Sequence, residues 1–361
     1  MTTEKTGRGL RKAGLRLLEP RPPRCAAMAV GSVPHTDPQA AVDLILARTP
    51  DIPAWPQLPR RSFLENMYVQ FAEGFPGLVV DERAQRVYVR DEIPPDEVMA
   101  FLAAYEGGDP EAFAVSAQHA AALPLLRRAL ENLSPPFVKG QVTGPISFGL
   151  TVPREDRRAL LYDDTLRDLA VRLLARKARW QADLLSRWAP ASVPLIMVDE
   201  PSLTQLGSAF VTIPVDIAFP ALEECLAAIP CLAGLHVCGG TDWESLARLP
   251  VDVLNFDAAD YLDSVVTQRE AVAAFVAAGG LLAWGCVPND QRAHDWGPER
   301  AARQVLSGAE ALAATGALSV DEVLGNAFVS PACGTGSLPL STAERCFTLA
   351  AETSAWLRRR L

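Results

Sequence analysis

The sequence predicts an α/β protein built as a single (β/α)8 TIM barrel with an elaborated N-terminal region. From Ala26 onward, short apolar runs alternate with loops rich in glycine and proline and with stretches that carry apolar residues at helical spacing. Strands that alternate with helices form parallel sheets with right-handed crossovers. The length of 361 residues also suits one large barrel with additional segments.

Seven apolar runs have the length and composition of strands. They are Ala27–Val33, Phe137–Val142, Leu195–Val198, Gly234–Val237, Val253–Phe256, Leu281–Trp284 and Ala327–Val329. Helical spacing is found in Asp164–Trp188, Pro220–Ala228, Val265–Ala277 and Glu299–Thr315. We expect the eighth strand between Ala40 and Leu133, where the pattern is less regular. In that stretch Gly77–Val89 predicts a hairpin and Pro94–Tyr105 predicts a helix, which we interpret as an elaboration near the mouth of the barrel.

The first 27 residues differ from the rest of the chain. They contain six basic residues between Arg8 and Arg24, almost no acidic residues, and three prolines between Pro20 and Pro23. This composition predicts a disordered extension over residues 1–27, or an upstream start before a natural beginning at Met28. A targeting segment is the alternative interpretation. The barrel would then comprise residues 28–361.

Charge, hydropathy and cysteine spacing exclude several classes of protein. The net charge of −9 and the isoelectric point of about 5.1 argue against nucleic acid or an anionic membrane as partner. No apolar run approaches the roughly 20 residues that a membrane-spanning helix needs. Five of the seven cysteines show no paired spacing and no secretory signal precedes them, so we expect a reducing, cytoplasmic setting without disulfides.

Three segments that follow strand-like runs carry residues that bind metal ions. His236 and Cys238 follow one run, Cys333 follows another, and Asp257 ends the run between them. In barrel enzymes the carboxyl ends of the strands hold the chemistry, so we expect these residues to meet there. One imidazole and two thiolates are ligands that zinc prefers. The alternative is that both cysteines are ordinary buried residues, as free cysteines usually are.

Two further strand ends carry polar residues that suit a small substrate. Gly31 and Ser32 form a turn after the first strand, with a hydroxyl and free backbone N–H groups that can hold a carboxylate. Asp199 and Glu200 end the strand Leu195–Val198 and can receive an ammonium group. The alternatives are a plain turn and a solvated loop.

Six short motifs occur in an order that resembles a known family. They are Gly31-Ser32-x-Pro34, Thr143-Gly144-Pro145, Pro153-Arg154-Glu155-Asp156, Asp199-Glu200-Pro201, His236-x-Cys238 and Pro331-x-Cys333-Gly334. In these motifs the chain resembles the catalytic domain of cobalamin-independent methionine synthase, from about Val30 to near the C-terminus. The wider superfamily includes uroporphyrinogen decarboxylase and methylcobamide:coenzyme M methyltransferase, and its members are (β/α)8 barrels.

The resemblance implies a role for each of these residues. His236, Cys238 and Cys333 would be zinc ligands, and Asp257 would replace the glutamate that is the family's fourth ligand. Asp260 is the second candidate for that fourth position. Ser32 would hold the carboxylate of homocysteine, and Asp199 its ammonium group, with Gly31 and Glu200 beside them. Residues 28–361 would then form a zinc-dependent methyltransferase domain.

The chain also departs from the family in three places. It has no second, N-terminal barrel, so it is similar to a short "core" methionine synthase. The family's histidine in an H-x-P context falls on Cys286-Val287-Pro288. A further carboxylate that helps to bind the homocysteine amine falls at or near Arg61, where Glu65 or Glu73 could substitute for it. An arginine at that position favours a more anionic thiol, such as coenzyme M.

These departures favour a methylated corrinoid as the methyl donor. Methyltetrahydrofolate needs a general acid at N5 before its amine can leave, whereas a methylcorrinoid leaves as cob(I)alamin without a proton. We therefore predict methyl transfer to homocysteine from a free corrinoid or a corrinoid protein. The alternatives are coenzyme M or another thiol as acceptor, a folate donor with His294 as a displaced acid, a metal-free decarboxylase of the uroporphyrinogen type, and a non-catalytic zinc-binding barrel.

Overall fold

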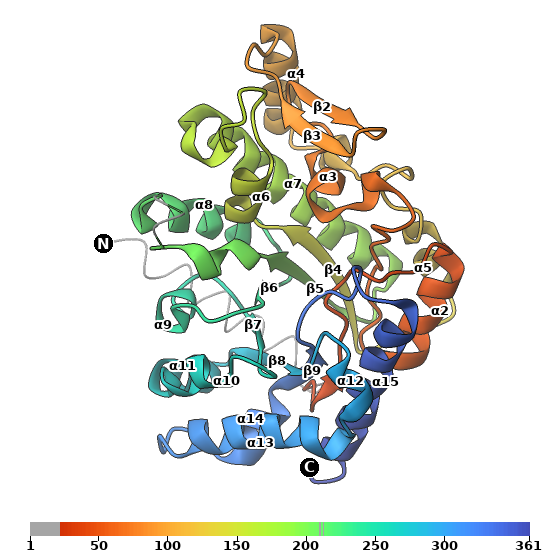
Figure 1. Ribbon diagram of the computed structural model, residues 1–361, viewed down its shortest axis with the longest axis vertical. Coiled ribbons are helices and arrows are strands. Elements are labelled where there is room, and N and C mark those ends of the chain that lie inside the picture. The colour runs from red at the N-terminus through yellow and green to blue at the C-terminus, as the bar shows by residue number, and fades with distance from the viewer. Residues whose placement is uncertain (1–21, 209–210, 212) are drawn as a thin grey trace.

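The structure of the chain, a computed structural model, describes residues 22–208, 211 and 213–361 (Figure 1). Within these residues, seven parallel strands form one curled sheet in the order β1-β9-β8-β7-β6-β5-β4. The strands are β1 (Ala26–Ala27), β4 (Phe137–Thr143), β5 (Val193–Asp199), β6 (Leu232–Val237), β7 (Val253–Asp257), β8 (Leu281–Val287) and β9 (Ala327–Pro331). The predicted α/β class and the parallel sheet are therefore confirmed, and each predicted strand overlaps an observed one.

Helices surround the outer face of the curled sheet (Figure 1). The α-helices are α2 (Pro38–Arg48), α3 (Met67–Ala72), α4 (Pro95–Gly107), α5 (Leu123–Leu130), α6 (Pro145–Thr151), α7 (Asp164–Trp188), α8 (Val215–Ala227), α9 (Trp243–Leu246), α10 (Leu262–Val266), α11 (Arg269–Ala277), α12 (Arg292–Asp295), α13 (Pro298–Ala313), α14 (Val320–Gly325) and α15 (Leu340–Arg358). Short 3-10 helices are η1 (Phe63–Glu65), η2 (Pro110–Phe113), η3 (Leu160–Tyr162) and η4 (Pro201–Gln205). Among the described residues, no helix is both long and apolar enough to cross a bilayer.

The predicted hairpin and helix before the main sheet are both present. Strands β2 (Leu78–Asp81) and β3 (Arg86–Val89) pair antiparallel, with Leu78 opposite Val89. Together with α4 they lie at one end of the long axis of the molecule (Figure 1). The hairpin forms a second sheet of its own, separate from the seven-stranded one.

The fold begins earlier than the sequence predicts. Cys25 is fully buried, and its backbone N–H donates to the Ala327 carbonyl at 2.6 Å. Ala26 and Ala27 pair with β9. Residues 22–27, which the sequence assigns to a disordered extension, therefore take part in the described fold: Cys25 and Ala27 join the large apolar core, and Ala26 packs with residues inside the curled sheet. The rest of the predicted extension, residues 1–21, lies outside the described residues.

The two edges of the sheet are joined through residues 51–57, which we call the closing segment. Its hydrogen bonds to β4 are Phe137 N to Asp51 O, Lys139 N to Pro53 O and Trp55 N to Lys139 O, and those to the chain after β1 are Gln57 N to Gly31 O and Val33 N to Gln57 O. The closing segment therefore lies between the two edges of the sheet, within the stretch from Ala40 to Leu133 where the sequence predicts an eighth strand. Pro53 and Pro56 carry no N–H and cannot donate, which keeps this segment from being a regular strand.

The side chains that point into the curled sheet change from apolar to polar along the strands. One apolar layer combines the closing segment with every strand of the sheet, namely Ala26, Met28, Ile52, Phe137, Leu195, Met197, Leu232, Val253, Leu281, Ala283 and Phe328. Successive strand residues point to opposite faces, so the same inward face continues through Asp199, His236 and Asn255 toward the carboxyl ends. The fold thereby places these polar residues in one interior space.

Buried polar side chains from β4 complete the hydrogen bonding beside the closing segment. Lys139 is fully buried, and its Nζ donates to Val30 O at 2.5 Å and to Gln141 Oε1 at 3.1 Å. Gln141 Nε2 donates to Trp55 O at 2.9 Å. Burial lowers the pKa of Lys139 to about 8. These side chains satisfy backbone carbonyls that a regular strand would have paired.

We expect the substitution Gln141→Leu to lower the free energy of unfolding by about 3 kcal/mol, since it leaves Trp55 O and the Lys139 ammonium each short of a buried partner. Urea denaturation followed by circular dichroism measures this change. Gln304→Leu on α13 is the matched control, because Gln304 is half-exposed, and its effect should stay within about 0.5 kcal/mol. Equal effects of the two substitutions would contradict this account of closure.

Candidate metal centre

Three predicted ligands come together at the carboxyl ends of β6 and β9. His236 lies near the end of β6, Cys238 directly follows that strand, and Cys333 lies two residues beyond β9. The ligand atoms of these three residues all lie within 4.8 Å of one another. In a tetrahedral zinc site with Zn–S of about 2.3 Å, ligand atoms lie roughly 3.6–3.8 Å apart. The cluster therefore has the donor atoms of a zinc site, at separations of up to 4.8 Å that binding of one ion would shorten.

A hydrogen bond fixes the orientation and the tautomer of His236. Its Nδ1 lies 2.7 Å from Asn255 Oδ1, and the amide nitrogen of Asn255 donates to Ala283 O at 2.8 Å. The amide oxygen of Asn255 is therefore an acceptor, and His236 Nδ1 carries the proton. Nε2 is then a lone-pair nitrogen, and it is buried without a hydrogen-bond partner. A metal-binding histidine has this same arrangement.

The two thiols of the cluster are electrostatically coupled. A hydrogen bond from Cys333 lowers the pKa of Cys238. The same hydrogen bond and burial raise the pKa of Cys333. The lowered pKa of Cys238 favours its thiolate, which is the form in which cysteine binds zinc.

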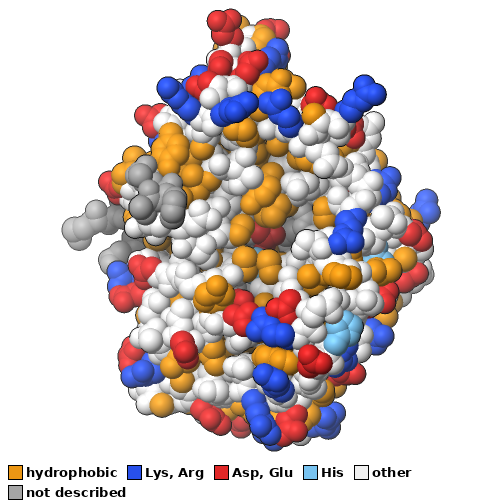
Figure 2. Space-filling view, viewed as in Figure 1, with side chains coloured by type: hydrophobic (Ala, Val, Ile, Leu, Met, Phe, Trp, Pro, Cys, Tyr) orange, Lys and Arg blue, Asp and Glu red, His pale blue; other side chains and the backbone are white. Residues whose placement is uncertain are grey.

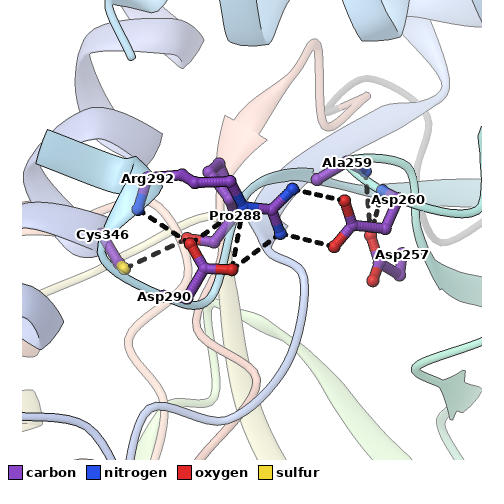
Figure 3. A network of polar contacts seen from close by, with 7 residues as sticks. All are labelled: Asp257, Ala259, Asp260, Pro288, Asp290, Arg292 and Cys346. Atoms are coloured by element: carbon purple, nitrogen blue, oxygen red, sulfur yellow. Dashed lines mark hydrogen bonds and ion pairs between the residues drawn. The ribbon is translucent and has the colours of Figure 1, made fainter. Parts of the chain in front are cut away.

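Asp257 and Asp260, the two candidates for a fourth ligand, lie outside this cluster. Asp257 Oδ1 accepts from the backbone N–H groups of Ala259 and Asp260, both at 2.9 Å. Burial raises the pKa of the Asp257 carboxyl to about 6. Both oxygens of Asp260 accept from Arg292 at 2.6 Å, and Figure 3 shows the Arg292 guanidinium between the carboxylates of Asp260 and Asp290. Asp260 is thus engaged in a surface ion pair.

A cavity of about 390 Å³ opens beside the three ligands. Its wall includes His236, Cys238, Cys333, Asp199, Ser32, Arg60, Glu65 and Tyr68. Figure 2 shows a hollow near the centre of the face in view, with acidic atoms at its floor and hydrophobic side chains beside it. The cavity is large enough for a small organic molecule, and the three ligands are exposed to it.

Asp199 and Ser32 take the positions on this wall that the sequence predicts. Asp199 ends β5 and is 6% exposed, and its Oδ1 has no hydrogen-bond partner. Burial raises the pKa of this carboxyl to about 6, although His236 and Lys139 oppose the rise. Ser32 Oγ accepts from the Gly336 N–H at 3.2 Å. The two residues therefore offer an unpaired acceptor and a hydroxyl to the cavity.

Glu200, which we expected to bind substrate, points away from the cavity. Its carboxylate accepts from the backbone N–H of Ile146 and Ser147 and from Ser147 Oγ, at 2.6–2.8 Å. These are groups in the first turn of α6, which has no side-chain cap of its own. Since neighbouring residues at a strand end face opposite directions, only Asp199 of this acidic pair can reach the cavity. Burial raises the pKa of Glu200 to about 7.

Gly31 and Arg61 also lie outside the cavity wall. A Cβ on Gly31 would lie 2.8 Å from Gln57 Oε1, so the glycine permits close packing of the chain after β1 on the closing segment. Arg61 Nη1 lies 3.0 Å from Glu65 Oε1, and its guanidinium faces the outside. From this stretch of the chain, the cavity is lined by Pro59, Arg60, Glu65, Asn66, Met67 and Tyr68. Arg60 follows the closing segment as the other site residues follow their strands. This signal was missed because Pro53 and Pro56 interrupt the strand pattern of the closing segment.

The other residues considered for proton transfer or substrate binding are elsewhere. Cys286 is fully buried in β8, and burial raises its pKa to about 12. His294 Nε2 lies 3.3 Å from Thr342 Oγ1, outside the cavity wall. Glu73 accepts from the Ser116 N–H and lies 3.3 Å from His119 Nδ1. Of the four histidines in the chain, His236 alone lines the cavity.

We expect Gly144→Ala to destabilise the fold by about 2 kcal/mol or more, because the added Cβ would lie within 2.3 Å of the Glu200 side chain, which three hydrogen bonds hold in place. Gly107→Ala is the control, since nothing lies within 4 Å of its added Cβ, and it should be neutral or slightly stabilising. Thermal unfolding of both variants is the measurement. A Gly144→Ala protein as stable as the parent would show that Glu200 is free to move.

We expect Asn255→Leu to weaken zinc binding about 10–100-fold, because His236 loses the hydrogen bond that orients it. Competition with a fluorescent chelator measures the affinity. Ser330→Ala is the control: Ser330 Oγ contacts the amide nitrogen of Asn255 at 3.2 Å but not His236, so zinc affinity should change less than about threefold. Parental zinc affinity in a folded Asn255→Leu variant would rule out this orienting role.

Comparisons with known proteins agree with the fold. No protein-family model and no curated protein matches the sequence. Among solved structures, the chain is similar to a B12-independent methionine synthase from Shewanella sp. W3-18-1 in complex with selenomethionine, with a TM-score of 0.56, 13% identity, and coverage of 93% of this chain and 98% of that one. It is also similar to a methyltransferase from Methanosarcina mazei, with a TM-score of 0.52, 12% identity, and coverage of 94% and 98%. The resemblance predicted from the motifs is thus confirmed at the level of the fold.

Proposed function

We propose that this chain is a zinc-dependent methyltransferase that moves a methyl group to the thiol of homocysteine, with a methylated corrinoid as donor. The observation that carries the proposal is the His236, Cys238 and Cys333 cluster on the wall of a cavity of small-molecule size. The similar structures of a methionine synthase and a methyltransferase support the same class of reaction. We further infer that the fold is a (β/α)8 barrel in which the closing segment is the irregular eighth strand.

A three-ligand cluster favours a catalytic over a structural zinc site. Structural zinc sites are closed by four protein ligands, whereas catalytic sites keep a position for substrate. The compact cluster supplies three ligands and faces the cavity. We propose Asp257 as the fourth ligand in the absence of substrate, because the N–H groups of Ala259 and Asp260 hold Oδ1 and leave Oδ2 for the metal. A non-catalytic zinc barrel would need no such cavity.

The residues of the wall have distinct roles in the proposed reaction. When bound, zinc would lower the pKa of the substrate thiol so that its sulfur is present as thiolate. Asp199 receives the ammonium group and Ser32 the carboxylate of homocysteine, which orients the sulfur toward the mouth of the cavity. The sulfur forms the new bond to the methyl carbon, the carbon–cobalt bond breaks, and the electron pair stays on cobalt. The thiol proton passes to solvent.

The side chains of the wall favour the corrinoid over folate as donor. A folate donor needs a general acid at the leaving nitrogen. Neither His294 nor Cys286 lines the cavity, and His236 is assigned to the metal. A corrinoid is much larger than a cavity of about 390 Å³, so it would present its methyl group at the mouth, free or on a corrinoid protein.

Other substrates agree less well with the cavity. A decarboxylase of the uroporphyrinogen type needs several arginines for propionates, and Arg60 is the one arginine on this wall among the described residues. Coenzyme M has no ammonium group and would leave the buried Asp199 without a partner. All seven cysteines are free, which supports a proposed cytoplasmic setting.

The direct test incubates the zinc-loaded protein with methylcobalamin and homocysteine and measures methionine by mass spectrometry. We expect production that stops when a chelator removes the metal. A parallel reaction with methyltetrahydrofolate should give none. If methionine forms only with methyltetrahydrofolate, the proposed donor is wrong. If coenzyme M is methylated in preference to homocysteine, the proposed acceptor is wrong.

We expect Cys238→Ala to lose at least 100-fold in zinc affinity and all measurable turnover, because one of the three clustered ligands is gone. Cys231→Ala is the matched control: Cys231 is half-buried outside the cavity, so zinc content and activity should stay at the level of the parent. Metal content by atomic emission and the methionine assay measure both. Full activity in the Cys238→Ala protein would disprove the scheme.

A further inference from the structure

One arginine of the cavity wall has no acidic partner. Arg60 Nη2 donates to the Ser337 carbonyl at 2.6 Å, which holds the guanidinium at the rim of the cavity. No carboxylate among the described residues lies within ion-pair distance of Arg60. Its neighbour Arg61 behaves differently, because it pairs with Glu65 at 3.0 Å. The positive charge of Arg60 is therefore available to a ligand.

The remaining charges of the wall leave one acid available as well. Glu65 is fully buried, and its carboxylate accepts from the Leu58 N–H and from Arg61. The positive charge of Arg61, outside the cavity wall, balances the negative charge of Glu65. Asp199 is 6% exposed, and its Oδ1 has no hydrogen-bond partner. The cavity thus presents one unpaired cation and one unpaired anion beside the three clustered ligands. Opposite charges at two places on one wall match a zwitterion.

We propose that Arg60 determines specificity by binding the carboxylate of the thiol substrate together with Ser32, which contacts Gly336 next to the Ser337 that holds Arg60, so that the cavity selects thiols that are also α-amino acids. This inference rests on the proposed thiol methyltransfer. A guanidinium binds a carboxylate through two parallel N–H···O bonds, and such pairs are stronger and more directional than neutral hydrogen bonds. Nη2 is fixed by Ser337, which leaves other N–H groups of the guanidinium for the substrate.

The proposal separates substrates by their charges. Homocysteine carries a thiol, an ammonium group and a carboxylate, and it satisfies the clustered ligands, Asp199 and Arg60 together. 3-Aminopropanethiol is homocysteine without its carboxylate, so it leaves Arg60 unpaired. Mercaptoethanesulfonate has an anion but no ammonium group, and it leaves Asp199 unpaired. Anionic groups on the methyl donor offer the same chemistry to a guanidinium, and the experiment therefore follows the donor as well.

The test compares Arg60→Gln with the parent for two thiols. With zinc-loaded protein and methylcobalamin, we expect Arg60→Gln to lower kcat/KM for homocysteine about 10–100-fold, mainly through KM, and to leave kcat/KM for 3-aminopropanethiol within about threefold. Arg60→Lys keeps the positive charge but not the two parallel N–H donors, so its kcat/KM for homocysteine should fall less than that of Arg60→Gln. Arg128→Gln on the exposed surface of α5 removes the same charge elsewhere and should change neither value.

Three outcomes would overturn the proposal. If Arg60→Gln lowers kcat/KM equally for both thiols, Arg60 acts on the fold or on metal binding. If Arg60→Gln raises only the KM for methylcobalamin, Arg60 binds the methyl donor. Calorimetric titration of both thiols into zinc-loaded protein separates this inference from the proposed function. If the parent binds homocysteine without turnover, the donor is wrong while discrimination by Arg60 is still measured. If the parent binds neither thiol, the inference fails with the proposed function.

Discussion

The hydrogen bonding of the closing segment is the constraint on which the rest of the structure depends. Prolines within residues 51–57 prevent a regular strand there. Two buried side chains of β4 therefore donate to backbone carbonyls, Lys139 to Val30 O after β1 and Gln141 to Trp55 O in the closing segment. The bond from Lys139 to Val30 O fixes the chain just before Ser32. The closing segment leads directly into the loop that carries Arg60 and Glu65. The segment that closes the sheet therefore also positions the residues of the cavity wall that follow it.

Contacts outside the cavity support the elements that form its wall. Asn255 orients His236, and Glu200 joins the end of β5 to the first turn of α6. The Arg292 guanidinium joins Asp260, after β7, to Asp290, after β8 (Figure 3). Such supporting contacts restrict the positions of the functional groups before any ligand binds, which reduces the ordering that binding must impose.

The sequence predicted which residues lie at the carboxyl ends of the strands. It did not predict which of two neighbouring side chains points into the cavity. His236, Cys238 and Cys333 were predictable because parallel strands end on one face. Glu200 was assigned to the substrate because adjacent acids look equivalent in sequence, although alternation turns one of them away. In the same way Arg61 was chosen where Arg60 faces the cavity. The closing segment lies within the stretch where we expected the eighth strand, but its bounds were not predictable, because Pro53 and Pro56 remove the pattern by which strands are recognised.

The cavity holds two buried polar atoms that the protein itself does not satisfy. Among the described residues, His236 Nε2 and Asp199 Oδ1 are the unpartnered buried side-chain atoms that belong to this wall. An unsatisfied buried group costs about 1–3 kcal/mol, so the folded state is less stable than complete pairing would make it. A metal on His236 and an ammonium group on Asp199 would remove both costs, and binding of each would stabilise the fold by linkage. The position of these two atoms on one cavity wall, beside the clustered His236, Cys238 and Cys333, therefore supports a binding site at this cavity.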